Sequence, residues 1–267
     1  MNLHQRILTY NDCYLKGQTI RPIGVMVHST GANNPNLSRY VGPDDGLLGQ
    51  NPNNNHWNMS GVGACVHAFI GRLADGSIAS YQTLPWNWRG WHCGSGRNGS
   101  ANNTHISFEI CEDGLDDPEY FQAVYQEAVE LTAHLCELYG LDPLEDGVVI
   151  CHSEGYRRGV ASNHGDVMHW FPKFGKNMDG FRADVSRKLK GDEDDMTQEQ
   201  FNQMMAKYER TKNPIPDNTP ADWEARAVQW AKDNGLLVGD GAGNLMLHSN
   251  MTRAQFFVIL KKYHEKR

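Results

Sequence analysis

The feature that most constrains the fold is an amphipathic stretch, residues 118–139, which lies between two apolar runs at 105–112 and 147–154. The two runs read as largely buried β-strands. Within the stretch, apolar side chains recur at steps of three and four residues, as on one face of an α-helix: Phe121, Val124, Ala128, Leu131, Leu135 and Leu138. Strand, helix and strand in this order are typical of an α/β domain.

Both ends of this helix carry suitable residues. Asp117 can cap its N-terminus, Pro118 suits the first turn and Gly140 suits its end. A second helix is expected at about 178–189.

Three further strands are expected before residue 100, at 23–30, 64–71 and 77–82. The Asp75-Gly76 pair between the last two predicts a hairpin. We therefore interpret residues 1–190 as one α/β unit.

The rest of the chain, residues 191–267, differs in character and opens with the acidic linker GDEDD. Residues 196–210 and 251–265 form a divergent internal repeat, in which Gln, Phe, two apolar positions, Lys and Tyr follow Met-Thr at matching offsets. Each copy opens with a capping box that starts a helix: Thr197 with Gln200, and Thr252 with Gln255. With a third helix at 221–234, the pattern predicts a small all-α domain.

Composition and charge exclude several functional classes. The formal net charge is −7 and the isoelectric point about 5.9. The chain therefore lacks the excess of basic residues that would indicate nucleic-acid binding. No apolar run reaches 18 residues, and we expect no membrane span. The first residues show no basic patch followed by an apolar core, so we expect no secretory signal and synthesis in the cytoplasm.

The six cysteines could form three disulfides, but Cys111 and Cys151 lie inside apolar runs. Buried free thiols are the favoured interpretation, and the lack of any Cys-x-x-Cys pair excludes a cysteine-based zinc finger.

Histidine is plentiful, with twelve residues in 267. His28 and His152 each end a predicted strand, and imidazoles at the ends of neighbouring strands can converge on a metal ion that loops leave accessible. A third ligand should come from the predicted loop after His152, where three candidates occur: Asp166, His164 and His169. No His-x-x-x-His or His-Glu-x-x-His pattern occurs, so spacing alone is also compatible with ordinary buried histidines.

Several motifs resemble one known family. VMVHSTGANNP, GWHCGSG, ISFEICE and ICHSEGYRRGVASNHGDVMHWF are similar, in this order, to motifs of the type 2 N-acetylmuramoyl-L-alanine amidases. These include phage endolysins and peptidoglycan-recognition domains. The resemblance covers roughly residues 20–175. It implies a central mixed sheet flanked by helices and a Zn²⁺ enzyme that acts on peptidoglycan.

The resemblance also implies site residues. The zinc ligands fall on His28, His152 and Asp166. The carboxylate base falls on Glu109, which would take a proton from water and pass it to the leaving amine. His164 takes the place of a residue that stabilises the oxyanion. For Glu109, the alternative is a partly buried strand residue paired with an arginine.

Other positions are expected to contact substrate. His92 and His67 match places where the family tends to have histidine. Trp91, in the tryptophan-rich loop PWNWRGWHC, could line a glycan or peptide groove, although one or two of these tryptophans could instead belong to the core. Asn33 offers an amide to a polar substrate, or lies in a solvated loop.

The C-terminal segment WEARAVQWAKDNGLL…MTRAQFFVILKKY, within residues 221–263, resembles a surface-layer-homology-like module. That resemblance implies binding to a secondary cell-wall polymer, and the alternative is a helical appendage for homodimerisation or solubility.

Taken together, the sequence predicts a zinc-dependent amidase. It would cleave the bond between N-acetylmuramic acid and L-alanine in a Gram-positive-type wall, as a phage or prophage endolysin that acts after release from the cell. Two alternatives stay open: a non-catalytic peptidoglycan-binding protein on the same fold, and a zinc peptidase that cuts the stem peptide.

Overall fold

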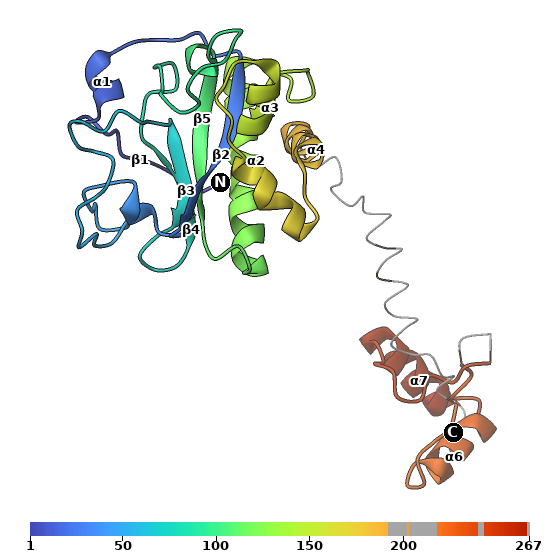
Figure 1. The fold of residues 1–267 in the computed structure, drawn as a ribbon. Coiled ribbons are helices and arrows are strands. Elements are labelled where there is room, and N and C mark those ends of the chain that lie inside the picture. The colour runs from blue at the N-terminus through green and yellow to red at the C-terminus, as the bar shows by residue number, and fades with distance from the viewer. Residues whose placement is uncertain (192–201, 203–204, 206–217, 240–242, 266–267) are drawn as a thin grey trace. The chain divides into compact units, whose positions relative to one another are not determined.

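The computed structural model describes residues 1–191, 202, 205, 218–239 and 243–265 (Figure 1). Contacts between residues divide the chain into two units, Met1–Glu193 and Asp194–Arg267. Each unit is described by itself. No helix of the described residues is long and apolar enough to cross a membrane.

The first unit is built on a six-stranded sheet with the order β1-β4-β3-β5-β2-β6. The strands are β1 (Leu3–Gln5), β2 (Gly24–Asn33), β3 (Ala68–Arg72), β4 (Ile78–Gln82), β5 (His105–Glu112) and β6 (Val149–Cys151). Only β3 and β4 pair in antiparallel fashion; the other neighbours are parallel. The sheet is therefore mixed, which confirms the expected fold class.

The described part of this unit, residues 1–191, contains four α-helices, namely α1 (Asp12–Lys16), α2 (Pro118–Tyr139), α3 (His152–Arg158) and α4 (Met178–Leu189). Short 3₁₀ turns connect them, among them η3 (Asp166–His169) and η4 (Phe171–Phe174). Figure 1 shows α2 and α4 on one side of the sheet, whereas α3 packs through Gly155 against Met26, on the other face. Helices α2 and α4 have the predicted bounds. Asp117 Oδ1 accepts hydrogen bonds from the backbone N–H of Glu119 and of Tyr120, both at 3.0 Å, and Gly140 adopts the left-handed cap.

Strand alternation decides which side chains form the core. On β5, Ile106, Phe108 and Ile110 face α2 and belong to the main hydrophobic cluster, as do Val25 and Val27 of β2. Because successive side chains point to opposite faces of a sheet, His28 and Glu109 lie on the face that α2 does not cover. The register of β2 and β5 sets these two residues opposite each other.

Two local predictions were wrong, and one strand was not predicted. Strand β6 ends at Cys151, and His152 opens a helix where a strand followed by a loop was expected. The three-residue strand β1 gave no recognisable sequence pattern. Cys13 and Cys65 form a disulfide, whereas Cys93, Cys111, Cys136 and Cys151 are free and buried as expected.

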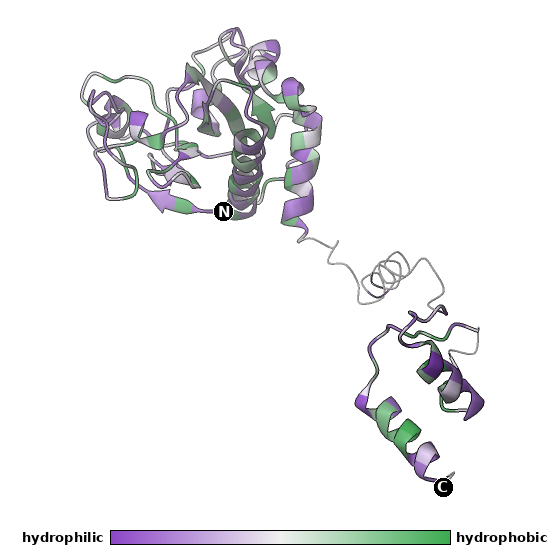
Figure 2. Cartoon of the chain, turned by 90° about the horizontal axis from the view of Figure 1, so that it is seen from below, coloured by the Kyte–Doolittle hydropathy of each residue, from purple (hydrophilic) through white to green (hydrophobic). Residues whose placement is uncertain are grey.

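The second unit contains α6 (Ala225–Asp233) and α7 (Arg253–Glu265) within its described part. The capping box before α7 is present: Thr252 N–H donates to Gln255 Oε1 at 2.8 Å, and Gln255 N–H donates to Thr252 Oγ1 at 3.2 Å. Neither α6 nor α7 has a buried residue, and Figure 2 shows that the central turns of α7 are apolar while its two ends are polar. The expected helix at 196–210, apart from residues 202 and 205, lies outside the described residues.

Candidate metal centre and catalytic pocket

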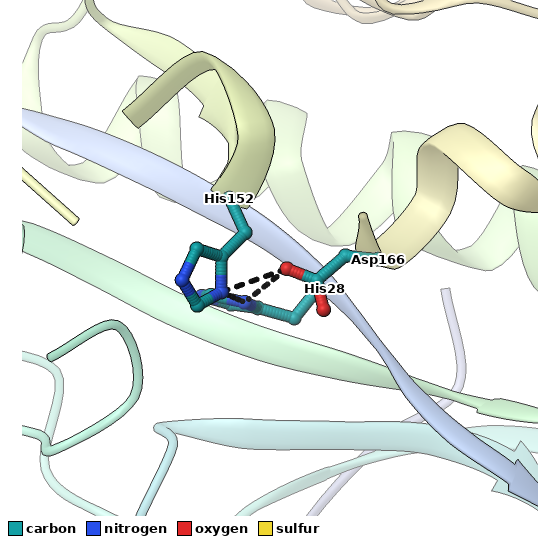
Figure 3. Close-up of side chains that lie close together, drawn as sticks. All are labelled: His28, His152 and Asp166. Atoms are coloured by element: carbon teal, nitrogen blue, oxygen red, sulfur yellow. Dashed lines mark hydrogen bonds and ion pairs between the residues drawn. The ribbon is translucent and has the colours of Figure 1, made fainter. Parts of the chain in front are cut away.

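Three side chains from separate elements converge on one point (Figure 3). His28 comes from β2, His152 from the first position of α3, and Asp166 from the first position of η3. Asp166 Oδ2 lies 2.8 Å from His152 Nδ1 and 3.2 Å from His28 Nδ1, and the two Nδ1 atoms are 3.2 Å apart. Strand β6 pairs with β2 directly, and this pairing brings the two histidines together.

The donor set fits a tetrahedral metal ion. Bonds of about 2.0–2.1 Å to nitrogen and oxygen imply ligand–ligand distances of about 3.3 Å, close to the three distances here. Two imidazole nitrogens that face each other and a carboxylate are electrostatically satisfied by a proton or a cation between them. Among the described residues, these three form the only group of this kind.

The outer nitrogen of each histidine is held so that Nδ1 stays available. His28 Nε2 lies 2.9 Å from His92 Nδ1, and His152 Nε2 lies 3.2 Å from Ser162 Oγ. Ser162 Oγ can donate to the Cys93 carbonyl at 3.1 Å, so it can accept from His152. Partners of this type fix the ring tautomer and raise the basicity of a ligating histidine.

His92 is itself positioned by a buried amide. Asn102 is fully buried, and its Oδ1 accepts from the backbone N–H of His92 at 2.8 Å and of Cys93 at 3.2 Å. Its Nδ2 donates to the Gly94 carbonyl at 3.0 Å. One side chain therefore shapes the loop that orients His28.

The start of α3 is fixed by charge and by close packing. Glu154 accepts a hydrogen bond from Cys151 N–H at 3.1 Å, which caps the helix, and pairs with Arg182 of α4 at 3.0 and 3.1 Å. Any Cβ at Gly155 would lie 2.8 Å from Met26 Cε, so glycine allows α3 to approach β2 closely. The position of His152 is therefore fixed both by the cap of α3 and by the packing of α3 against β2.

Asp166 is held by its backbone and its neighbours. Its φ of 45° lies in the left-handed region, which aspartate tolerates better than most residues but which still costs energy. Val167 and Trp170, next to it, have no exposed surface and belong to the main core. The core thus anchors the turn that presents the carboxylate.

Electrostatics favours the forms that bind a cation. Burial lowers the pKa of His28, which favours the neutral ring. The pKa of Asp166 is lowered because hydrogen bonds and charge interactions from His152 and His28 outweigh its burial. A neutral imidazole and an ionised carboxylate are the ligand forms of these groups.

Glu109 is the unusual carboxyl group of the site. Its Oε2 is buried and has no hydrogen-bond partner among the described residues. Burial raises its pKa well above the ordinary value, and the charges of Asp166 and Glu112 add to the rise. The predicted alternative, an arginine partner, is not found in the described part of the chain. A carboxyl of this kind in a pocket is suited to proton transfer.

A pocket of about 390 Å³ gathers most of the predicted site residues. It is lined by His28, Ser29, Thr30, Gly31, His92, Glu109, His152, His164, Gly165, Asp166 and His169. His164 packs against His152 with ring centroids 4.7 Å apart, and its Nδ1 lies 3.1 Å from Ser162 Oγ. His169, a candidate third ligand, lines the pocket but pairs with Glu112 instead.

Three predicted substrate contacts lie outside this lining. His67 is completely buried: its Nε2 lies 2.7 Å from the Trp88 carbonyl, and its Nδ1 accepts from Ser107 N–H at 3.0 Å. No ring nitrogen of His67 is left for a substrate, so we withdraw that assignment. Trp91 is 47% exposed and Asn33 is exposed at the end of β2, but neither lines the pocket.

Sequence reasoning missed the supporting residues Ser162, Asn102 and Glu112. Each acts through a loop or a strand end whose geometry no short motif encodes. A polar residue between Val160 and His164 was the only local signal for Ser162.

Comparisons with known proteins identify a family. A family model described as N-acetylmuramoyl-L-alanine amidase matches residues 18–168. No curated protein sequence matches the chain.

Several solved structures are similar. PlyL is 19% identical, over 69% of this chain and 96% of that chain, with a TM-score of 0.47. A mutant endolysin from Bacillus subtilis is 24% identical, over 69% of this chain and 99% of that chain, with a TM-score of 0.47. The Staphylococcus aureus hydrolase AmiA in complex with its ligand is 21% identical, over 70% and 82%, with a TM-score of 0.45.

The family model spans more than half of the sequence. The chain therefore belongs to the N-acetylmuramoyl-L-alanine amidase family and is an amidase of that class.

Proposed function

We propose that this amidase is zinc-dependent and hydrolyses the amide bond between N-acetylmuramic acid and L-alanine in peptidoglycan of a Gram-positive-type wall. The observation that carries the proposal is one pocket in which His28, His152 and Asp166 converge while Glu109 presents an unpaired buried carboxyl oxygen. The resemblance of the motifs to phage endolysins supports the same role here, namely lysis of the wall from a phage or prophage.

In this proposal His28 and His152, through Nδ1, and Asp166, through Oδ2, hold Zn²⁺. The chemistry gained from the bound ion is polarisation of the scissile carbonyl and acidification of a water molecule. Ser162 and His92 keep the two histidines in the ligating tautomer.

Glu109 is proposed to act first as general base and then as general acid. Its carboxylate accepts a proton from the attacking water at Oε2 and later gives it to the leaving nitrogen of L-alanine. The raised pKa of Glu109 suits both halves of this transfer because the group can hold the proton between the two steps.

His164 is proposed to stabilise the oxyanion. It is exposed at the pocket, two residues before Asp166, and Ser162 holds its Nδ1 at 3.1 Å. Nε2 is the other ring nitrogen, and it donates to an oxygen as negative charge develops when the ring is protonated, or when Ser162 gives its hydroxyl proton to Nδ1 instead of to the Cys93 carbonyl.

Neither alternative function explains the pocket as well. A peptidoglycan-binding protein without activity has no need of a buried, unpaired carboxyl group, which costs stability. A zinc peptidase could use the same groups, and the products distinguish it from an amidase.

For the second unit we propose binding to a wall polymer. Its described part exposes large aromatic side chains, with Trp223 83% and Trp230 51% exposed. Flat apolar rings of this kind suit stacking on sugars. Homodimerisation through the same side chains is the competing role.

Mass analysis of wall digests tests the function. The proposal predicts new L-alanine N-termini together with intact glycan strands. Cleavage inside the stem peptide would establish the peptidase instead, and binding without products would establish the non-catalytic protein.

A further inference from the structure

The pocket contains a second imidazole–carboxylate pair, separate from the metal cluster. His169 Nε2 lies 3.0 Å from Glu112 Oε1. The Glu112 side chain is 4% exposed, whereas that of His169 is 41% exposed and lines the pocket. The pair therefore joins a buried carboxyl group to an accessible ring.

Glu112 is rigidly fixed at the end of β5. Ser29 Oγ donates to the same Oε1 atom at 2.5 Å, and Glu112 N–H donates to Thr30 Oγ1 at 3.1 Å. Its carbonyl accepts from Asn34 N–H at 2.8 Å. The register between β2 and β5 shifts between Ser29 and Asn33, and irregularities of this type re-aim side chains beside active sites.

His169 is fixed from the other side. It ends the 3₁₀ turn that Asp166 begins, and Val167 and Trp170 anchor that turn in the core. One short turn thus directs Asp166 to the metal cluster and His169 to Glu112.

A purely structural role would explain the contact between His169 and Glu112, but not why the His169 ring lines the pocket. Because Nε2 is engaged by Glu112, the ring offers Nδ1 as its remaining polar atom. The ring lines the same pocket as the exposed His164, whose Nδ1 contacts the neutral Ser162. A buried carboxylate that orients an accessible imidazole is the arrangement used for histidines that act on substrates.

We propose that His169 contacts a polar group of the substrate beside the scissile amide through Nδ1, with Glu112 as the positioning residue. This inference rests on the amidase function proposed above. It assigns the pocket a substrate-contacting histidine in addition to His164.

The experiment is a double-mutant cycle in the full chain, measured on a soluble muramoyl-peptide. In His169→Gln the side-chain amide can replace Nε2 towards Glu112 but leaves nothing at the Nδ1 position. We expect a loss in kcat/KM of about 10- to 100-fold, with zinc content and melting temperature close to those of the wild type. The kcat/KM of Glu112→Gln should fall less than that of His169→Gln. His134→Gln, on α2 and outside the pocket, is the matched control.

The cycle separates positioning from structure. If Glu112 acts through His169, the double variant Glu112→Gln/His169→Gln should be no slower than His169→Gln alone. Losses that multiply, or full activity of His169→Gln, would overturn the inference. A purely structural pair would lower the melting temperature and leave kcat/KM per folded, zinc-loaded molecule unchanged. If the wild type itself fails to cleave the substrate, the proposed function fails, and not this inference alone.

Discussion

The two units of the chain differ in how far their helices and strands bury apolar side chains. In the first unit, a mixed sheet and α2 enclose a large apolar core, and side chains such as Phe108 and Trp170 are fully buried. In the second unit, α6 and α7 bury no residue, and apolar side chains such as Phe257 and Val258 are 62% and 54% exposed. A polar pocket can be held rigidly only by the first kind of unit.

This difference has a functional meaning. The pocket side chains are oriented by neighbours that the core fixes, as Trp170 fixes the turn of Asp166. Preorganised sites of this type suit catalysis. Exposed apolar side chains instead suit contact with a partner.

The largest expected effect is at Glu109. Replacement by Gln keeps the shape but removes the base, so kcat/KM should fall by about 10²- to 10⁴-fold. Zinc content, measured by metal analysis, should not change. Glu119→Gln, at the exposed start of α2, is the control. Retention of activity by Glu109→Gln would show that the proton is transferred elsewhere.

The second effect concerns acid stability of the first unit. Burial lowers the pKa of His67 from 6.5 to about 4. The unfolded chain therefore binds more protons than the folded one between these values, and stability is lost as the pH falls from about 6.5 to about 4. At about 1.4 kcal/mol per pKa unit, the full loss is about 3 kcal/mol.

Urea denaturation at pH 7 and pH 4.5 measures this contribution. The stability advantage of the wild type over His67→Gln should shrink by about 2–3 kcal/mol at the lower pH. His264→Gln, on α7 of the other unit, should show no such change. An advantage independent of pH would mean that His67 does not titrate in this window.

The third effect is on metal affinity. Ser162→Ala removes the hydrogen-bond partner of His152 Nε2 and leaves all three proposed metal ligands in place. Zinc affinity should fall by about 10- to 100-fold, as for other outer-sphere partners of ligating histidines. Competition with a chromophoric chelator gives the constant, and Ser77→Ala, in the turn before β4, is the control. An unchanged constant would separate Ser162 from the metal centre.

The smallest catalytic effect is expected from deletion of residues 194–267. Activity on a soluble substrate and the melting of the first unit should stay within about twofold and a few degrees of the full chain, because this core is complete. Sedimentation with whole walls should weaken. Equal wall binding by both proteins would assign the second unit another role, and a lost dimer in light scattering would identify that role as assembly.

Much of the first unit was predictable because its signals are local. The spacing from Phe121 to Leu138 and the caps Asp117 and Gly140 gave α2 with its correct bounds. The helix that begins at His152 was missed because its cap depends on Glu154 and on Arg182, which lies 28 residues further along the chain. The Cys13–Cys65 disulfide joins residues 52 positions apart, and no spacing rule indicates it.

The same distinction applies to the pocket. His28 and His152 were predictable because each lies at or next to the end of a buried strand, and motif resemblance supplied Glu109 and Asp166. The partners that orient them were not predictable. Ser162, Asn102 and Glu112 depend on how loops close over the sheet, which is a property of the folded chain.

The most direct test of the account is a zinc titration of metal-stripped protein, with release of new L-alanine N-termini from walls as the readout. The account predicts activity that rises in proportion to bound zinc and saturates at one ion per chain. Asp166→Asn should bind zinc weakly and stay inactive at the same total zinc. Full activity without metal, or an Asp166→Asn variant that titrates like the wild type, would contradict the assignment of His28, His152 and Asp166 as the zinc site.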